Sequence, residues 1–408
     1  MPTTVFKPTR LDPDPYTTLT STNPVITAVG SDGKYVVTWN QQKDQSSVIR
    51  VDLYNADGSL NATKELQAGS LSIYYSLIAP VITALSSGGY VVSWSGYDGN
   101  DNTIYVQKFN ADGTTSTGRQ TITETGSTSD EEAPRVAEVG AVGEFVVVYQ
   151  GEDWVSNGPR DYSIYVQRFT AAGAKQGSAI KLEGDNQAAS GTTADDDDVT
   201  PQVTALGTTG EFVVTWAGEA SDGIHDIYVT KFNADGSQQP RVKLSSDAAA
   251  GLNDAQPQVA AVGTAGEFVV TWSGQDGGTP SDYSIYVQKF DASGAITGAQ
   301  IKLEPEGNTT DQEVTPRISA LGNDGSFAVV WQNNNSKLSV YIQQFTAAGT
   351  TSSVDNRPVP STGSIDVKSS EAGNAYLVKD SVVVNTLADI TTAADDQWNS
   401  VAITAANT

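Results

Sequence analysis

The sequence predicts an all-β repeat fold, and three observations lead to this prediction. One sequence pattern occurs six times between Pro24 and Phe345. Within each copy, short runs alternate apolar and polar residues with the period of a β-strand. The chain of 408 residues contains 38 glycines, which suits the tight turns of antiparallel sheets. Sheets that are apolar on both faces must stack on one another, and a ring leaves no end face uncovered. We therefore predict a β-propeller, with six blades of four antiparallel strands.

The chain begins with an extended lead-in over residues 1–20. Three prolines between positions 8 and 15 disfavour a helix there. Val5 and Phe6 could form a short strand that closes the ring.

Each copy then opens with a proline and a first strand. These prolines are Pro24, Pro80, Pro134, Pro201, Pro257 and Pro316. A Gly-rich turn leads to the second run, which is FVVTW in the fourth copy. Phe212 and Trp216 lie on one face of this strand, and Val213 and Thr215 lie on the other. Because both faces are largely apolar, we expect neighbouring blades to cover both.

Third runs such as IYVQKF end at a tight turn such as NADG, and weaker fourth runs such as AIKLE complete each copy. We assign residues 21–360 to the six-repeat propeller. Residues 361–408 contain no further copy and read as a linker followed by a partial β segment. In the alternative interpretation, this tail supplies a seventh blade.

Two stretches resemble known families. The pattern P-x-V-x-A-L, F-V-V-x-W and Y-V-Q-x-F resembles the blade-like repeats of large exported bacterial surface proteins, the repeats-in-toxin adhesins. The tail segments AYLV, DSVVV and ITTAADDQWNSVAI resemble the start of an immunoglobulin-like tandem repeat of such proteins. The glycine- and aspartate-rich calcium nonapeptides of these proteins do not occur in this sequence. The resemblance implies a monomeric module of a longer chain, located outside the cell or on the bacterial cell surface.

The composition excludes several classes of function. The chain has 23 Lys and Arg against 48 Asp and Glu, a net charge of −25, which repels nucleic acids and anionic membranes. Cysteine is absent, and His225 is the single histidine, so disulfides and Cys nucleophiles are excluded. No N-terminal signal peptide and no apolar run long enough to insert into a membrane are visible.

Sequence variation concentrates in two sets of segments, the loops after the second strand and those leading into the next copy. Antiparallel connectivity brings both sets to one face, where loops on a rigid scaffold commonly carry function. These segments are rich in acids, and carboxylates and amides are the ligands that Ca²⁺ prefers. The candidate metal ligands are Asp98, Asn100 and Asn102, with D-x-N-x-N spacing, and Asp195, Asp197 and Asp198 in a second loop. A solvated acidic loop is the alternative at each position.

Aromatic residues in the same segments are candidate ligand-binding residues. They are Tyr97, Trp154, Tyr162 and Tyr283, whose rings could stack on sugars or grip a peptide. Packing of these rings onto the rim is the alternative.

The sequence thus predicts a non-catalytic extracellular binding or adhesion module. Its acidic face would bind a glycan or a protein on another surface, assisted by Ca²⁺. The alternatives are a structural spacer and a carbohydrate-active propeller enzyme, either a glycosidase or a polysaccharide lyase. Arg135 and Arg317 form one pair at equivalent positions, whereas a sialidase-like site needs three arginines. His225 could act as a general base, but a lone loop histidine is more often a plain surface residue.

Overall fold

A computed structural model describes most of the repeat region and two short strands of the tail. The described residues are 11, 21–43, 46–67, 78–122, 130–140, 142–153, 161–183, 197–221, 224–245, 252–276, 282–304, 312–334, 338–352, 373–378 and 398–403. The predicted strand at Val5 and Phe6 lies outside them.

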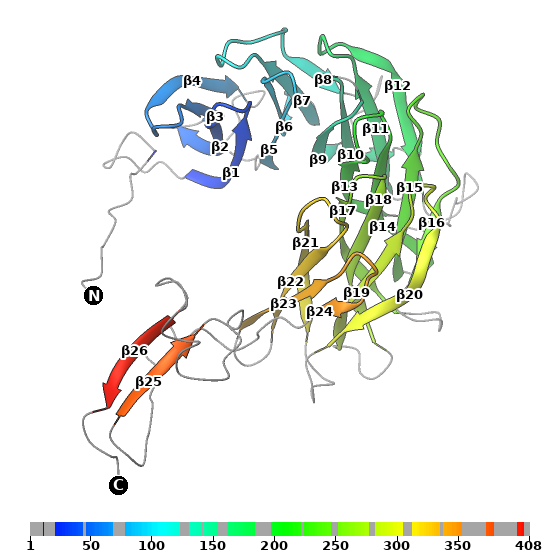
Figure 1. The fold of residues 1–408 in the computed structure, drawn as a ribbon. Helices are drawn as coiled ribbons and strands as arrows, with labels where there is room; N and C mark the ends of the chain where they lie inside the picture. Colours follow the sequence, from blue (N-terminus) through cyan, green and yellow to red (C-terminus); the bar gives the residue numbers. More distant parts are fainter. Residues whose placement is uncertain are drawn as a thin grey trace. The chain divides into compact units, whose positions relative to one another are not determined.

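The repeats form six antiparallel sheets of four strands each (Figure 1). The first three sheets consist of β1 (Ser21–Val29), β2 (Lys34–Lys43), β3 (Ser46–Tyr54) and β4 (Leu60–Gln67); β5 (Ile78–Ala84), β6 (Tyr90–Tyr97), β7 (Asn102–Phe109) and β8 (Gln120–Ile122); and β9 (Glu131–Glu138), β10 (Phe145–Asp153), β11 (Asp161–Phe169) and β12 (Lys175–Leu182). The last three consist of β13 (Asp198–Ala205), β14 (Phe212–Ser221), β15 (Ile224–Phe232) and β16 (Val242–Leu244); β17 (Asp254–Val262), β18 (Glu267–Gln275), β19 (Tyr283–Phe290) and β20 (Ile296–Leu303); and β21 (Glu313–Ala320), β22 (Phe327–Asn333), β23 (Ser339–Phe345) and β24 (Thr351–Ser352).

Every sheet is a simple meander in which each strand pairs with the next one along the chain. Consecutive sheets contact one another through their first strands, from β1 with β5 through to β17 with β21. The predicted all-β propeller architecture, with six four-stranded blades, is confirmed.

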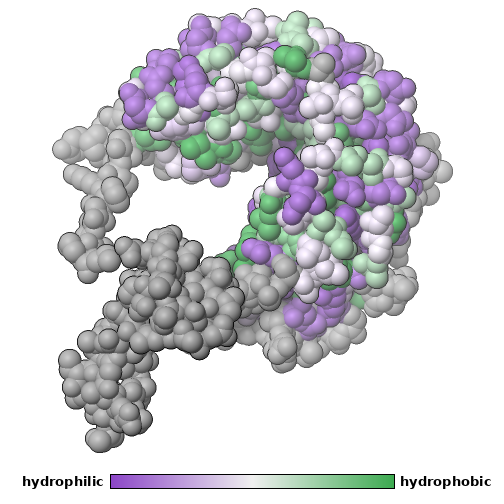
Figure 2. All heavy atoms as spheres, in the orientation of Figure 1, coloured by the Kyte–Doolittle hydropathy of each residue, from purple (hydrophilic) through white to green (hydrophobic). Residues whose placement is uncertain are grey.

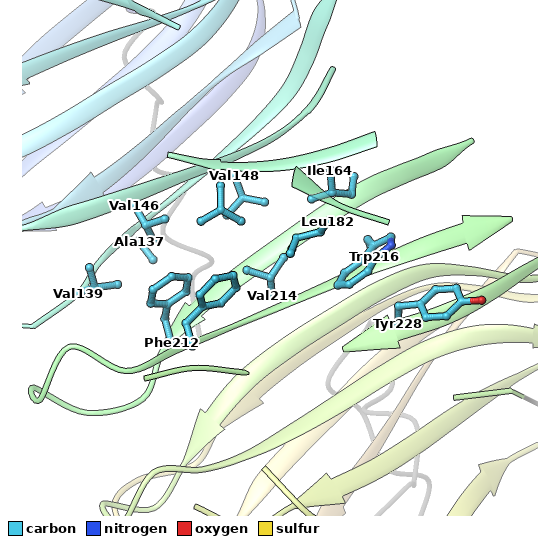
Figure 3. Close-up of a cluster of buried hydrophobic side chains, with 12 residues drawn as sticks. Ala137, Val139, Val146, Val148, Ile164, Leu182, Phe212, Val214, Trp216 and Tyr228 are labelled. Atoms are coloured by element: carbon cyan, nitrogen blue, oxygen red, sulfur yellow. The ribbon is translucent and has the colours of Figure 1, made fainter. Parts of the chain in front are cut away.

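The main cores lie between consecutive sheets rather than within them. Between the third and fourth sheets, Val148 and Ile164 from one side meet Phe212 and Trp216 from the other (Figure 3). The opposite face of β14, including Val213, packs against the fifth sheet. Each fully buried side chain of this size contributes about 1.5–3 kcal/mol to stability. The prediction that both faces of the FVVTW strand are covered is confirmed for this sheet.

The chain divides into two compact units, Met1–Val354 and Asp355–Thr408. The second unit contains β25 (Gly373–Val378) and β26 (Trp398–Ile403), which pair in antiparallel fashion. The immunoglobulin-like and seventh-blade interpretations of the tail stay predictions. Among the described residues, no helix is long and apolar enough to cross a lipid bilayer. Hydrophilic residues cover much of the outer surface of the sheets in the view of Figure 2.

Candidate functional site

The meander gives the sheets two unlike faces. The turns between strands one and two, and between strands three and four, lie at one end, which we call the turn face. The loops between strands two and three, and the segments leading into each first strand, lie at the other end, which we call the loop face. On the turn face the NADG-type turns repeat one bond, from the glycine amide to the carbonyl three residues earlier, as from Gly58 N to Asn55 O (2.9 Å) and from Gly236 N to Asn233 O (2.9 Å). The predicted tight turns are confirmed.

On the loop face, a repeated hydrogen bond connects consecutive sheets. The backbone amide near the start of a third strand donates to a side-chain oxygen four residues before the next sheet's proline. The bonds of this kind are Asn102 N to Asp130 Oδ1 (2.8 Å), Tyr162 N to Asp197 Oδ1 (3.1 Å) and His225 N to Asn253 Oδ1 (2.9 Å). We call this contact the latch. It explains why acids and amides recur just before the first strands.

A β-bulge in the first strand accompanies the latch. The residue immediately before the proline has a positive φ in five sheets: Asn23 (55°), Ala133 (49°), Thr200 (55°), Gln256 (56°) and Thr315 (53°). Non-glycine residues rarely adopt this left-handed conformation, and the pairing register shifts at the same place. Because the bulge recurs in most sheets, it belongs to the scaffold.

The residue three positions before the proline is a buried carboxylate in four sheets: Glu131, Asp198, Asp254 and Glu313. Asp198 Oδ1 accepts a hydrogen bond from Trp216 Nε1 (2.9 Å), and Glu313 Oε1 accepts one from Asn333 Nδ2 (2.6 Å). Asp197 and Asp198, two of the predicted metal ligands, thus have different structural partners, one in the latch and one in the core. Asp195 lies outside the described residues.

The junction between the second and third sheets gathers several loop-face acids. Asp98 Oδ1 accepts from the amides of Asn100 (2.8 Å) and Asp101 (3.3 Å), which makes Asp98–Asp101 a tight turn. Asn102 then reaches the third sheet, where its Nδ2 donates to Glu132 Oε1 (3.3 Å). The sequence predicted the D-x-N-x-N segment as a candidate site, but did not pair it with Glu132. The acidic stretch SDEEA was the signal for that partner, and only the packing of the two sheets brings them together.

Burial and like charge act together on two acids of this group. Burial raises the pKa of Asp101, and so do the negative charges of Asp98 and Asp130. A hydrogen bond from Asn100 lowers the same pKa. Burial raises the pKa of Glu132, as do the neighbouring charges of Asp130 and Glu152. Glu132 also occupies a position that is apolar in the other later sheets, where it corresponds to Val199, Ala255 and Val314. A charged residue at an otherwise apolar position with a raised pKa is a candidate for function.

The metal prediction finds limited support in this geometry. Among the described residues, no three His, Cys, Asp or Glu side chains are grouped so that they could hold a metal ion. Asn100 Nδ2 donates to Asp101 Oδ2 (3.0 Å) and Asn102 Nδ2 donates to Glu132 Oε1 (3.3 Å), so neighbouring carboxylates orient both amide side chains. Calcium binding stays a prediction.

The aromatic candidates occupy two kinds of position. Tyr97 ends β6 and pairs with Asn102. Tyr162 and Tyr283 occupy equivalent positions in the third and fifth sheets, and both are partly exposed. Tyr162 carries a latch, and Tyr283 forms a backbone bridge to Gln312, the equivalent residue before the sixth sheet. Trp154 lies outside the described residues.

Two clefts of the described region lie on the turn face. One, of about 580 Å³, is lined by the first turns of the first two sheets and by Glu138. Both oxygens of Glu138 accept from Ser86 N, at 2.8 and 2.7 Å. The other, of about 380 Å³, lies between the fifth and sixth sheets and is lined in part by Lys289 and Phe327. The prediction placed function on the opposite face.

Comparison with solved structures finds several carbohydrate-active enzymes that the chain matches at low identity. An endo-arabinase from Bacteroides thetaiotaomicron is 15% identical, over 64% of this chain and 92% of that chain, with a TM-score of 0.36. An α-L-arabinofuranosidase from Fusarium graminearum is 12% identical, over 65% and 80% of the two chains, with a TM-score of 0.44. A polysaccharide lyase is 11% identical, over 86% and 84%, with a TM-score of 0.46. No family model and no curated protein sequence matches the chain. At this level of similarity, the matches concern the fold alone.

Proposed function

We propose that the repeat region is a carbohydrate-binding module whose loop face recognises the ligand. One observation carries the proposal: a constant backbone position on this face presents a different kind of side chain in successive sheets. The position near the start of the third strand holds Asn102, Tyr162, His225, Tyr283 and Leu338. Its backbone is held by the latch in three of these sheets and by a strand bridge in a fourth.

Side-chain chemistry at this position favours a sugar ligand. All five side chains are at least partly exposed. Tyrosine rings present an apolar face for stacking and a hydroxyl for hydrogen bonding, while amides and carboxylates pair with sugar hydroxyls. The resemblance of the repeats extends the proposal to an adhesion role in a bacterial surface protein, with Ca²⁺ assistance.

Paired tyrosine variants test the proposal directly. Tyr162→Ala/Tyr283→Ala should lower the affinity for a glycan identified on an oligosaccharide array by about tenfold or more, because ring stacking is lost while the backbone latch stays. The matched control is Tyr162→Phe/Tyr283→Phe, which keeps both rings and should keep most of the binding. Thermal melting of each variant checks the fold. The absence of any glycan hit with the wild-type chain would sink the proposal, and repeating the array with EDTA tests the Ca²⁺ contribution.

A second candidate function is carbohydrate cleavage, favoured by Glu132. A carboxyl with a raised pKa can hold a proton for a leaving group, and Asp130 and Glu152 lie close enough to influence it. Glu132→Gln should abolish product release from polysaccharides while leaving glycan binding intact. Product formation that is unchanged in this variant, or absent in the wild type, would remove this candidate.

A further inference from the structure

The cleft between the fifth and sixth sheets coincides with a packing contact that the other junctions have and this one lacks. The tight turn after each third strand carries a glycine. In four junctions, a Cβ atom placed on this glycine would meet a side chain of the preceding sheet. The pairs are Gly113 with Ala62 (3.0 Å), Gly173 with Thr117 (3.0 Å), Gly236 with Arg168, and Gly294 with Gln239 (3.0 Å). At Gly349 of the sixth sheet, such an atom would meet no described atom within 4 Å.

The fifth sheet leaves this space open because its side chains there are short. Its fourth strand, β20, carries Gly298 and Ala299 in the wall of the cleft. The third sheet also has a glycine at this place, Gly177, but there the guanidinium of Arg168 fills the space beside the next turn. The fifth sheet has Lys289 at the position of Arg168, and a cleft of about 380 Å³ remains.

The cleft combines an apolar floor with a charged rim. Val287 and Phe327, which are 1% and 0% exposed, form the floor together with the partly buried Ile301. Lys289 and Glu267 line the rim, where 18% and 35% of their side chains are exposed. A hydroxyl group pressed against this floor would lose its hydrogen bonds to water without replacement. The buried part of a ligand is therefore apolar, which disfavours a sugar in this cleft.

The two rim charges stand further apart than the same pair in the preceding junction. Lys231 Nζ lies 2.7 Å from Glu211 Oε1, whereas Lys289 Nζ lies 3.8 Å from Glu267 Oε1. Both lysines also bond a turn carbonyl of the following sheet, at 2.6 and 2.5 Å, so that anchor is the same in the two junctions. An ammonium group has three donors and a carboxylate has about four acceptor sites, so each rim group can take a further partner.

We propose that this cleft binds a free α-amino acid with an apolar side chain, such as leucine. The α-carboxylate pairs with the Lys289 ammonium group, the α-ammonium group pairs with Glu267, and the side chain lies on the apolar floor. A free amino acid carries both charges on neighbouring atoms beside one apolar group, which matches the order of groups in the cleft. The cleft volume falls within the range of about 300–1,000 Å³ that is typical of small-molecule sites. This site lies on the turn face and does not depend on the carbohydrate recognition proposed for the loop face.

Calorimetric titration of the full chain with L-leucine tests the site. Two analogues are the ligand controls: isocaproate lacks the ammonium group, and isoamylamine lacks the carboxylate. Leucine should bind, and each analogue should bind about tenfold more weakly or worse, because it loses one charge-assisted hydrogen bond. Isocaproate that binds as tightly as leucine would overturn the proposal.

Lys289→Arg is the main variant, because Arg168 shows what an arginine does at this position. Arg168 Nη2 keeps the bond to the next turn, at Ala234 O (3.3 Å), while its guanidinium occupies the space that the ligand needs. Lys289→Arg should therefore weaken leucine binding by about tenfold or more although the positive charge is retained. Lys231→Arg is the matched control, since it makes the same change in the preceding junction and should leave leucine binding unchanged.

Glu267→Gln tests the second rim group. It should weaken leucine binding by about tenfold and leave the weak binding of isocaproate unchanged, because only leucine uses the carboxylate. Thermal melting of each variant checks the fold.

Each outcome of these titrations decides for or against the site. Leucine binding that Lys289→Arg and Glu267→Gln weaken and Lys231→Arg spares supports it. The absence of leucine binding at millimolar concentration, or equal weakening in Lys289→Arg and Lys231→Arg, overturns it. None of these results depends on a glycan, so failure of this site and failure of the proposed function are distinguishable.

Discussion

The fifth and sixth sheets have the same strand pattern but differ sharply in burial. On β19, the side chains of Ile285 and Val287 are 0% and 1% exposed, whereas their equivalents on β23, Val340 and Ile342, are 79% and 39% exposed. The sixth sheet covers the first pair with Phe327, Val329 and Trp331. In the described part of the chain, no further four-stranded sheet follows to cover the second pair.

The first sheet has an exposed apolar residue on its opposite face. Ile26 is 65% exposed, although its equivalents Val259 and Ile318 pack against the preceding sheet. The repeat therefore sets which side chains are apolar, while the neighbouring sheet decides whether such a side chain is buried and contributes to stability. The neighbouring sheet thus buries these positions in the inner sheets, and the same positions are exposed in the first and sixth sheets.

The largest expected effect comes from truncating equivalent residues of the two sheets. Ile285→Ala should lower the free energy of unfolding by about 2–5 kcal/mol, because it leaves a cavity in a packed core. Val340→Ala should change it by less than about 0.5 kcal/mol, because that side chain is already in water. Chemical denaturation followed by tryptophan fluorescence measures both. A large loss in Val340→Ala would mean that this face is covered in solution.

A smaller effect should distinguish the turn-face contacts of inner and end sheets. Lys231 Nζ bonds Glu211 Oε1 (2.7 Å) and reaches the next sheet at Ala292 O (2.6 Å). Lys231→Met should cost about 1–3 kcal/mol, because it leaves a partly buried acceptor without its charged donor. Gln344 holds the equivalent position in the sixth sheet, and Gln344→Met should change stability by less than about 0.5 kcal/mol. Equal effects in the two variants would show that the lysine does not act between sheets.

The smallest expected effect concerns the junction between the second and third sheets. Since the pKa of Glu132 is raised in the fold, the unfolded chain loses this proton first as pH rises. Glu132 therefore reduces stability progressively as pH climbs from its ordinary pKa through the folded one. Glu132→Gln should raise the melting temperature at neutral pH, which corresponds to a gain of less than about 1 kcal/mol in the free energy of unfolding. In acid, the melting temperature should stay unchanged. A stabilisation that persists below pH 4 would indicate a packing effect instead.

Strand positions and the propeller class follow from the sequence because each copy carries its own strand period and turn residues. The alternation in FVVTW and the NADG turn are local signals, and six repetitions make them unambiguous. The sequence also marked the loop-face acids and Tyr162 and Tyr283 as candidates, since these vary on a constant scaffold.

Only the tertiary structure decided which residues meet. The latch between Tyr162 N and Asp197 and the contact of Asn102 with Glu132 each join residues from different sheets. Their sequence separations carry no local signal, because packing between sheets, and not chain connectivity, sets these distances. For the same physical reason, the sequence determined that Val340 and Ile342 are apolar, while the arrangement of the sheets determined that they are exposed.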